Sequence, residues 1–320
     1  MTALVGHQDQ RAAFEAAFAS GKMHHAWLLS GPRGIGKRTF ATAAARMVLA
    51  GATSFDVDNS DPQARAFDAD AHPDFRKLQR GLTKTGDKLA QNIVVDQVRA
   101  FLPVLNQTPS LSEWRVVLID SACEMNTASA NAFLKSLEEP PKQTIFLLVC
   151  HSPGRLLPTV RSRCRTLTFR PLPSSQVREV LQSELDDHSD MDALVQIADG
   201  APGRALRFAG LEVAELMSTL ARLEAVDDND ARDLALTLGQ RLALKAAQPR
   251  FEAFLELAVT HLADAAKRAQ PDQLAARLAL WDEARTLAGD ALAKSLDPSV
   301  VAFQIARLVG HLSTAEQRAA

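Results

Sequence analysis

Three glycines and a lysine near the start of the chain are spaced to hold phosphate. The segment from Gly31 to Lys37 reads GPRGIGK, with Gly34 and Gly36 inside it. Glycines let successive backbone N–H groups turn inward around phosphate oxygens, and the lysine adds a positive charge at a helix N-terminus. The chemistry indicated is binding of nucleotide phosphates, and a chance glycine-rich turn is the alternative.

This P-loop pattern departs from its usual form directly after the lysine. The pattern G-x-x-x-x-G-K-[ST] needs a hydroxyl there to hold Mg²⁺. The chain has Arg38 at that position, and Thr39 follows one residue late. Because a cation stands where a metal ligand belongs, we expect weakened binding of a magnesium–nucleotide complex.

An acidic residue ends a second apolar run. Asp120 closes RVVLID, and in a P-loop fold such an aspartate belongs to the Mg²⁺ shell. An ordinary core strand with an aspartate turn is the alternative. An active ring-forming ATPase usually has glutamate next, whereas this chain has Ser121, and a serine hydroxyl is no carboxylate base. Glu124 lies three residues on, and we expect it to point elsewhere.

Three arginines follow a later apolar run. LLPTVRSRCRTLTF contains Arg161, Arg163 and Arg165. On a solvated face they would mean little. Beside a strand of a P-loop fold they suggest a group presented to phosphate, because a guanidinium is always charged and forks onto phosphate oxygens.

The elements that must position these residues follow from the apolar patterns. Short apolar runs bounded by turn residues predict strands, and 3.6-residue periodicity predicts helices around and after them. The sequence thus predicts a parallel α/β sheet with helices on both faces, then a small helical lid and a helical collar. Residues 51–70 are polar and predict a loop or short insertion. The predicted strands are 26–30, 75–78, 93–95, 115–120, 144–150 and 166–169.

Composition limits the function classes. The 320 residues are 47% hydrophobic, enough for a substantial core, and the net charge of −2 gives no overall attraction to nucleic acid. The three cysteines show no C-x-x-C spacing, so we expect no zinc site and reduced thiols, as in the cytoplasm. The N-terminus has no signal-peptide pattern, and no apolar run is long enough to span a membrane. We therefore expect a cytoplasmic protein.

Four motifs together resemble one known family. GPRGIGK, VVLID, NAFLKSLEEPP and LLPTVRSRC, in this order and spacing, are similar to the clamp-loader branch of the AAA+ ATPases. The resemblance covers residues 1 to about 210, and its most specific parts are LEEPP and the SRC tripeptide. It implies an AAA+ P-loop domain over 1–171, a helical lid over 172–210 and a collar for oligomerisation over 211–320.

The resemblance also implies roles for single residues. Arg163, in the SRC tripeptide, would be an arginine finger that points into the ATP site of a neighbouring subunit. Arg204, after Gly-Ala-Pro-Gly, would be the sensor-2 arginine that reaches the phosphates from the lid; a surface arginine is the alternative. The family's polar sensor falls on Cys150, a weak hydrogen-bonding group. The nucleotide-binding residues implied are Gly31, Gly34, Gly36, Lys37, Thr39, Asp120 and Arg204.

Arg38, Ser121 and Cys150 degrade three parts of the hydrolytic apparatus together. That pattern is typical of a non-hydrolysing stator subunit, whose own binding of ATP or ADP is weak or absent. The implied partners are motor subunits of the tau/gamma type and a delta-type subunit in a hetero-pentameric ring. The ring would load a sliding clamp onto primer–template DNA during replication. Many clamp-loader chains carry a cysteine zinc module after the P-loop helix, and residues 51–75 contain no cysteine.

Two other functions stay open. The chain would be a self-sufficient AAA+ ATPase if Thr39 took the Mg²⁺ role and Glu124 acted as the base. It would be a DNA-binding module if the P-loop fold served only as a scaffold. Near-neutral charge, three tryptophans and no tyrosine argue against extensive base stacking.

Overall fold

The computed structural model describes residues 4–82, 90–105 and 107–317 and divides into two compact units. One unit comprises Met1–Glu184 with Ala198–Arg204, and the other comprises Leu185–Ile197 with Ala205–Ala320. The residues predicted as a lid, 172–210, are shared between the two units. The division into three domains therefore stays a prediction.

A parallel sheet forms the centre of the first unit. Its five strands follow the order β2-β3-β4-β1-β5 and all pair in parallel. The inner strands are continuous apolar runs because both faces of the sheet are covered, and all seven residues of β4 are buried. The predicted parallel α/β fold is confirmed. The strands are β1 (Ala26–Ser30), β2 (Phe75–Gln79), β3 (Arg115–Asp120), β4 (Thr144–Cys150) and β5 (Arg165–Thr168).

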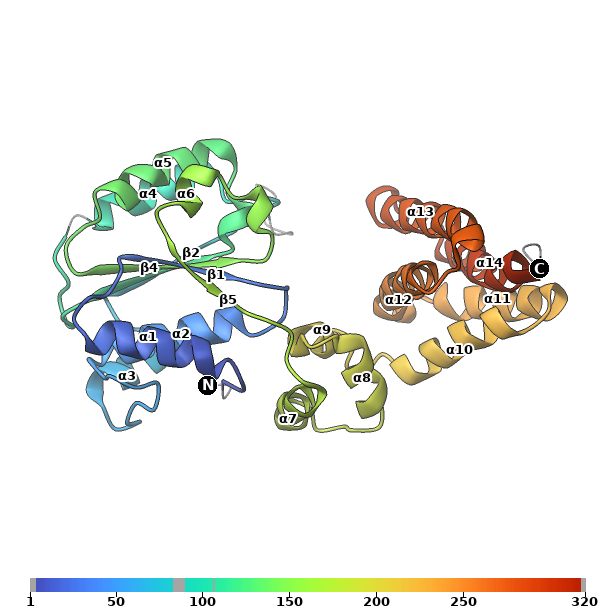
Figure 1. Ribbon diagram of the computed structural model, residues 1–320, viewed down its shortest axis with the longest axis horizontal. Coiled ribbons are helices and arrows are strands. Elements are labelled where there is room, and N and C mark those ends of the chain that lie inside the picture. Colours follow the sequence, from blue (N-terminus) through green and yellow to red (C-terminus); the bar gives the residue numbers. More distant parts are fainter. Residues whose placement is uncertain (1–3, 83–89, 106, 318–320) are drawn as a thin grey trace. The chain divides into compact units, whose positions relative to one another are not determined.

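Helices cover both faces of this sheet (Figure 1). Helices α1 (Gln8–Ala19), α2 (Lys37–Leu49) and α3 (Pro62–Asp68) lie on one side, and α4 (Val95–Leu105), α5 (Thr127–Glu138) and α6 (Pro158–Arg161) lie on the other. Neighbouring residues of β1 enter different cores, because successive strand side chains point to opposite faces. Trp27 packs with Phe14 and Phe40, whereas Leu28 belongs to the core around Phe133.

Two sequence predictions in this unit are wrong. Residues 93–95 form no strand: Ile93 makes a single bridge to Met125, and α4 already begins at Val95. The run is too short to pair along a neighbour before the helix starts. Residues 51–70 are more than a loop, because they contain α3. The Asp61 carboxylate caps that helix through the backbone N–H groups of Gln63 and Ala64.

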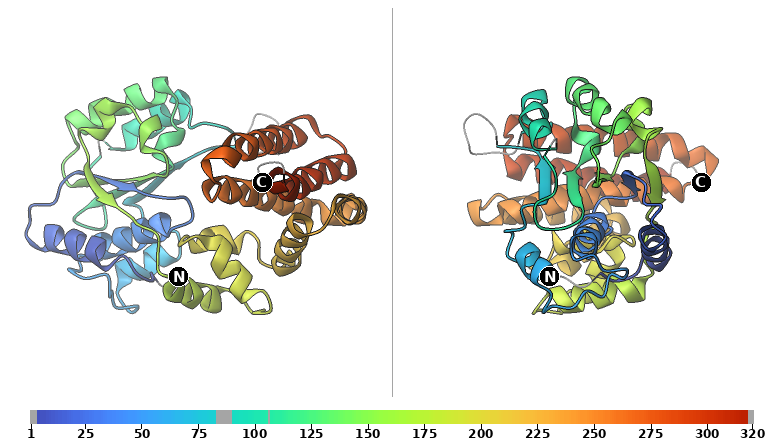
Figure 2. Two further views of the ribbon diagram at one scale, coloured as in Figure 1. Left: turned by 45° about the vertical axis from the view of Figure 1, so that its right-hand side comes forward. Right: turned by 90° about the vertical axis from the view of Figure 1, so that its left-hand side faces the viewer.

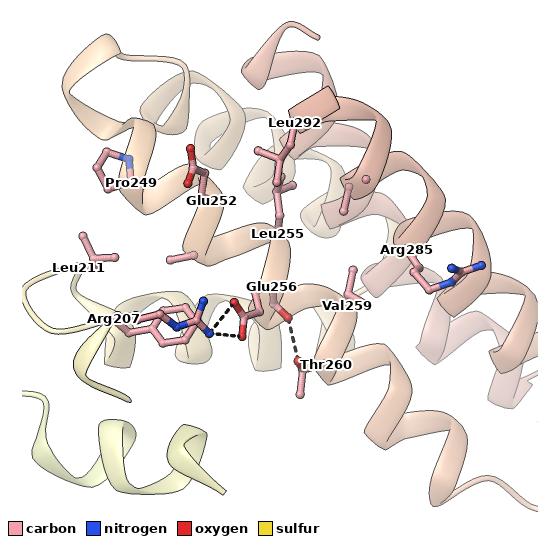
Figure 3. A pocket seen from close by; sticks show the side chains of 14 residues that line it. Arg207, Leu211, Pro249, Glu252, Leu255, Glu256, Val259, Thr260, Arg285 and Leu292 are labelled. Carbon is pink, nitrogen blue, oxygen red and sulfur yellow. Dashed lines mark hydrogen bonds and ion pairs between the residues drawn. The ribbon is translucent and has the colours of Figure 1, made fainter. Parts of the chain in front are cut away.

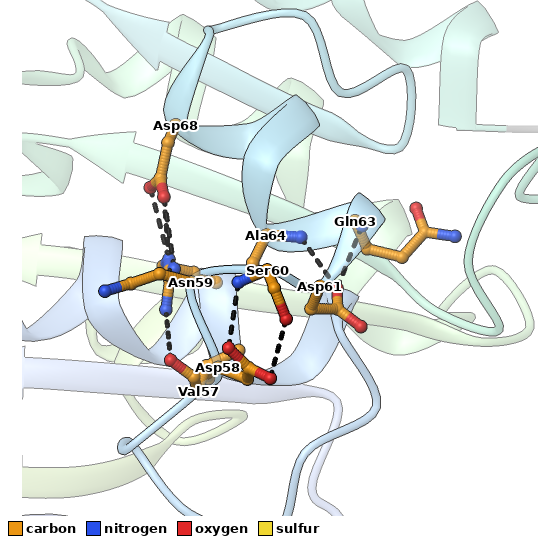
Figure 4. A network of polar contacts seen from close by, with 9 residues as sticks. Val57, Asp58, Asn59, Ser60, Asp61, Gln63, Ala64 and Asp68 are labelled. Carbon is orange, nitrogen blue, oxygen red and sulfur yellow. Dashed lines mark hydrogen bonds and ion pairs between the residues drawn. The ribbon is translucent and has the colours of Figure 1, made fainter.

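One arginine ties the segment around α3 to the P-loop helix. Arg46 of α2 is buried and donates hydrogen bonds to the Asp68 carboxylate at 3.1 and 3.2 Å. It also donates to the Val57 carbonyl at 3.1 Å and to Asn59 Oδ1 at 2.9 Å (Figure 4). A buried guanidinium needs such partners, so this network fixes the path of the chain from Val57 to Asp68.

The rest of the chain is helical (Figure 2). The second unit contains an open pocket of about 590 Å³ beside α12 and α13, with the Arg207–Glu256 ion pair in its lining (Figure 3). No helix within the described residues is long and apolar enough to cross a membrane. The helices are α7 (Ser174–Glu184), α8 (Met191–Ala198), α9 (Pro202–Leu206), α10 (Val213–Ala225), α11 (Asp228–Leu242), α12 (Gln248–Lys267), α13 (Pro271–Lys294) and α14 (Pro298–Gln317).

Candidate nucleotide site and arginine finger

The P-loop joins the carboxyl end of β1 to α2 and contacts the start of α9. Gly34 adopts φ +81°, and a Cβ there would lie 2.7 Å from the Arg204 nitrogen, so only glycine fits. The Gly34 carbonyl accepts a hydrogen bond from the Gly203 N–H at 2.8 Å. The structure therefore brings the backbone of Arg204 to the P-loop, two segments far apart in the sequence.

Lys37 is held inside its own loop. Its ammonium donates hydrogen bonds to the carbonyls of Gly31 at 2.7 Å and Pro32 at 2.6 Å, and the residue is only 4% exposed. Burial lowers the pKa of Lys37 to about 8, because desolvation penalises the charged form. A phosphate that entered the loop would compete with these two carbonyls for the ammonium.

Arg38 lies beside the predicted metal-shell carboxylate. Its Nε is 3.5 Å from Asp120 Oδ2, with the Arg38 side chain 63% exposed and that of Asp120 18% exposed. Arg38, on the P-loop helix, is thus one of the cations near Asp120, and Lys37 and Lys77 also interact electrostatically with this carboxylate. A divalent ion at Asp120 would have to displace this guanidinium or tolerate its charge nearby.

The two other degraded positions, Ser121 and Cys150, both contact Cys123. Ser121 Oγ lies 3.1 Å from His151 Nδ1 and 3.2 Å from Cys123 Sγ. The Cys150 thiol contacts the Cys123 thiol, and this contact together with burial raises the pKa of Cys150, so it stays neutral. Neither Ser121 nor Cys150 offers a carboxylate or a strong donor to a nucleotide. Sequence analysis missed Cys123 and His151, although both lie at strand ends next to predicted site residues.

Glu124, the base of the alternative ATPase, is already paired. Its Oε2 lies 2.9 Å from Arg80 Nε, and its side chain is only 12% exposed. The backbone of Glu124 is fixed as well, because its carbonyl accepts from the Ile93 N–H at 2.8 Å. A carboxylate that is largely buried and already paired with a guanidinium is not free to approach an attacking water.

Arg163, the predicted arginine finger, lies near the amino ends of the sheet strands, whereas the P-loop follows their carboxyl ends. Trp27 of β1 pairs with Arg165 of β5, and Ser30 pairs with Thr168, so Arg163 precedes the amino end of β5. The P-loop follows Ser30 at the carboxyl end, and the strands alone separate these levels by roughly 10 Å at 3.3 Å per residue. Arg163 therefore lies at the end of the sheet opposite to its own P-loop.

The three clustered arginines have different surroundings. The Arg165 guanidinium stacks over the Trp27 ring at 4.8 Å and so serves packing. Arg163 Nη2 lies 2.7 Å from Glu138 Oε1, and its Nη1 donates to the Thr159 carbonyl at 2.9 Å. Arg161 is exposed at the end of α6. Sequence analysis singled out Arg163 but missed its partner Glu138 in the LEEPP motif.

The parallel sheet, with its P-loop between β1 and α2, defines a P-loop α/β domain. Residues 6–173 match the family model described as "DNA polymerase III, delta subunit". That match covers more than half of the chain, and the chain belongs to this family.

Two curated relatives and one solved structure are similar to this chain. DNA polymerase III subunit delta' of Pseudomonas aeruginosa is 37% identical over 195 residues, which cover 60% of this chain and 57% of the relative. Subunit delta' of Escherichia coli is 32% identical over 202 residues, 60% of this chain and 56% of the relative. The matches thus span little more than half the length of these relatives. A gamma subunit-related protein of Thermotoga maritima superposes with a TM-score of 0.48 at 14% identity, covering 94% of this chain and 99% of that chain.

Proposed function

We propose that this chain is a stator subunit of a clamp loader, which helps a DNA polymerase III holoenzyme place a sliding clamp on primed DNA. In this role it donates Arg163 to the ATP site of a neighbouring subunit in the cytoplasmic replication complex. The family match and the relatives named delta' support the assignment to the holoenzyme.

The observation that carries the proposal is the position of Arg163 at the amino edge of the sheet. An arginine at the carboxyl edge would serve the P-loop of its own chain. Arg163 lies at the opposite edge, with a side chain that is 35% exposed, and can therefore meet a phosphate only on another molecule. An arginine finger supplied in trans stabilises charge on the transferred phosphoryl group and is worth about 10³–10⁵ in rate in related systems.

The contacts within the P-loop site support a subunit that does not hydrolyse ATP itself. Arg38 pairs with Asp120, and Arg80 pairs with Glu124. The residues present thus fit a phosphate-binding loop without the metal ligand and base that hydrolysis requires. ATP or ADP binding by Gly31, Gly34, Gly36, Lys37, Thr39, Asp120 and Arg204 remains a proposal, and the alternative of a self-sufficient ATPase gains no support from Glu124.

The partners proposed are motor subunits of the tau/gamma type and a delta-type subunit in a hetero-pentameric ring, with the sliding clamp and primer–template DNA reached through the complex. The helical second unit supports a role in assembly. Helix α13 carries leucines that are exposed in the isolated chain, namely Leu274, Leu278 and Leu292. Leu274 and Leu278 are four residues apart and so lie on one face of the helix, and contiguous exposed apolar surface is typical of sites that pack against other proteins.

The test is ATP hydrolysis by the reconstituted loader with clamp and primed DNA, comparing wild type with Arg163→Ala in this chain. We expect hydrolysis at the one ATP site that Arg163 serves to fall by about 10³-fold, so that this site's share of the turnover is lost, with assembly intact by size-exclusion chromatography. Arg161→Ala removes an equal charge from the same turn and is the matched control. Unchanged turnover in an assembled Arg163→Ala complex would refute the arginine-finger role.

A further inference from the structure

A carboxylate at the end of α5 holds the guanidinium of Arg163. Glu138 Oε1 and Arg163 Nη2 are 2.7 Å apart, which is the distance of a strong charge-assisted hydrogen bond. The Thr159 carbonyl accepts from Nη1 of the same guanidinium at 2.9 Å. Two acceptors therefore hold the Arg163 guanidinium by its two terminal nitrogens.

The exposure of the Arg163–Glu138 pair shows that this contact is not part of the buried core. The side chains of Arg163 and Glu138 are 35% and 49% exposed. An ion pair in such a position adds little to stability, because water screens both charges and the long side chains lose entropy. What the contact does change is the freedom of Arg163, whose side chain would otherwise sample many rotamers.

These two hydrogen bonds leave other N–H groups of Arg163 free to bind phosphate. A guanidinium has five N–H donors, and Glu138 and Thr159 account for one on each terminal nitrogen. Nη1 also lies 3.5 Å from Ser162 Oγ. Among the contacts of the described residues, Nε and the second N–H of Nη2 are left to meet phosphate oxygens while both hydrogen bonds stay in place. Thr159 lies on α6 and Glu138 on α5, two helices that pack on the same face of the sheet, so the acceptors have a rigid base.

We propose that Glu138 is a positioning residue that pre-organises Arg163 for a neighbour's ATP site. This inference rests on the proposed function, because it assigns Glu138 a role through Arg163. A side chain held in the orientation it needs in the transition state loses no further entropy during the reaction. Glu138 itself touches no substrate.

The test is turnover of the reconstituted loader with Glu138→Ala in this chain. We expect the rate at the ATP site that Arg163 serves to fall by roughly 10–100-fold, because a displaced catalytic group costs up to about 10² in rate. The KM for ATP should change less than about twofold, since Arg163 acts on charge that develops only in the transition state. Glu138→Gln keeps a hydrogen-bond acceptor and should recover part of the rate. Glu139→Ala removes an equal charge from the adjacent exposed position and should leave turnover unchanged.

A double-mutant cycle separates positioning from a merely structural effect. In the Arg163→Ala background, adding Glu138→Ala should cost nothing further, because the residue it positions is gone. An equal loss in both backgrounds would overturn the proposal, as would wild-type turnover of Glu138→Ala. A faster loader would overturn it too, since Glu138 would then restrain Arg163 rather than position it. If Arg163→Ala alone changes nothing, the proposed function fails instead.

Discussion

Replacing Arg38 by serine should give the P-loop magnesium-dependent nucleotide binding. The change creates G-x-x-x-x-G-K-S, which places a hydroxyl where the motif holds Mg²⁺. It also removes the guanidinium that lies 3.5 Å from Asp120 and so frees that carboxylate. Both effects favour a divalent ion at the same point of the loop.

The magnitude follows from the charge that is removed. Arg38 is 63% exposed, so a water-like dielectric constant applies. A unit charge about 4 Å from a divalent ion then costs about 2 kcal/mol. That energy corresponds to roughly 30-fold in affinity. Arg38→Ala should show this electrostatic gain alone, and the excess in Arg38→Ser measures the hydroxyl.

The assay is calorimetric titration of each chain with ADP, in excess Mg²⁺ and in EDTA. We expect Mg²⁺ to raise the affinity of Arg38→Ser for ADP by roughly 30-fold or more relative to its effect on wild type. Arg38→Lys keeps the charge and is the control that should behave as wild type. The reasoning is refuted if Mg²⁺ has the same effect on wild type and Arg38→Ser, or if Arg38→Lys gains as much.

Two further predictions concern α2. In the Arg38→Ser chain, ADP affinity should fall as pH rises from 7 to 9, because Lys37 has a lowered pKa of about 8 and loses the charge that attracts phosphate above it. Calorimetry in Mg²⁺ should show no such fall when Lys37→Met is added, and an equal fall would refute this role. Arg46→Met should lower the free energy of unfolding by about 1–3 kcal/mol, because the Asp68 carboxylate, the Val57 carbonyl and the Asn59 side chain lose the buried guanidinium that donates to all three. Urea denaturation measures this, and Arg65→Met, an exposed arginine on α3, should change it by less than about 0.5 kcal/mol; equal effects would contradict the prediction.

Sequence analysis predicted those parts of the fold that depend on local pattern. The strands β1, β3 and β4 are unbroken apolar runs, and such runs have few alternatives in a chain with a P-loop. Helix α3 escaped prediction because its segment is polar, although Asp61 followed by Pro62 is a helix-start signal. Residues 93–95 misled for the opposite reason, since an apolar run of that length also suits the entry to a helix.

The same distinction between local and long-range features applies to the candidate site. The glycines and Lys37 could be found because their chemistry lies in one short segment. The pairs Arg38–Asp120, Arg80–Glu124 and Arg163–Glu138 could not, because each joins segments that meet only in the folded chain. Spacing shows which residue types are present, whereas the charge that each carboxylate compensates depends on the packing of the sheet and its helices.

These pairs explain how a degraded P-loop is compatible with the arginine finger proposed for Arg163. Asp120 lies at the carboxyl edge of the sheet with 18% of its side chain exposed, and a half-buried carboxylate without a cation would be costly. Arg38, together with Lys37 and Lys77 nearby, supplies positive charge from within the chain, so the carboxyl ends of the strands need no metal to keep their charge balance. The strands β1 and β5 then extend from this stable edge to the amino edge, where the Trp27–Arg165 contact fixes the start of β5. Because Arg163 lies two residues before that contact, its position depends on the sheet and on Glu138. It does not depend on whether the chain's own loop holds a nucleotide.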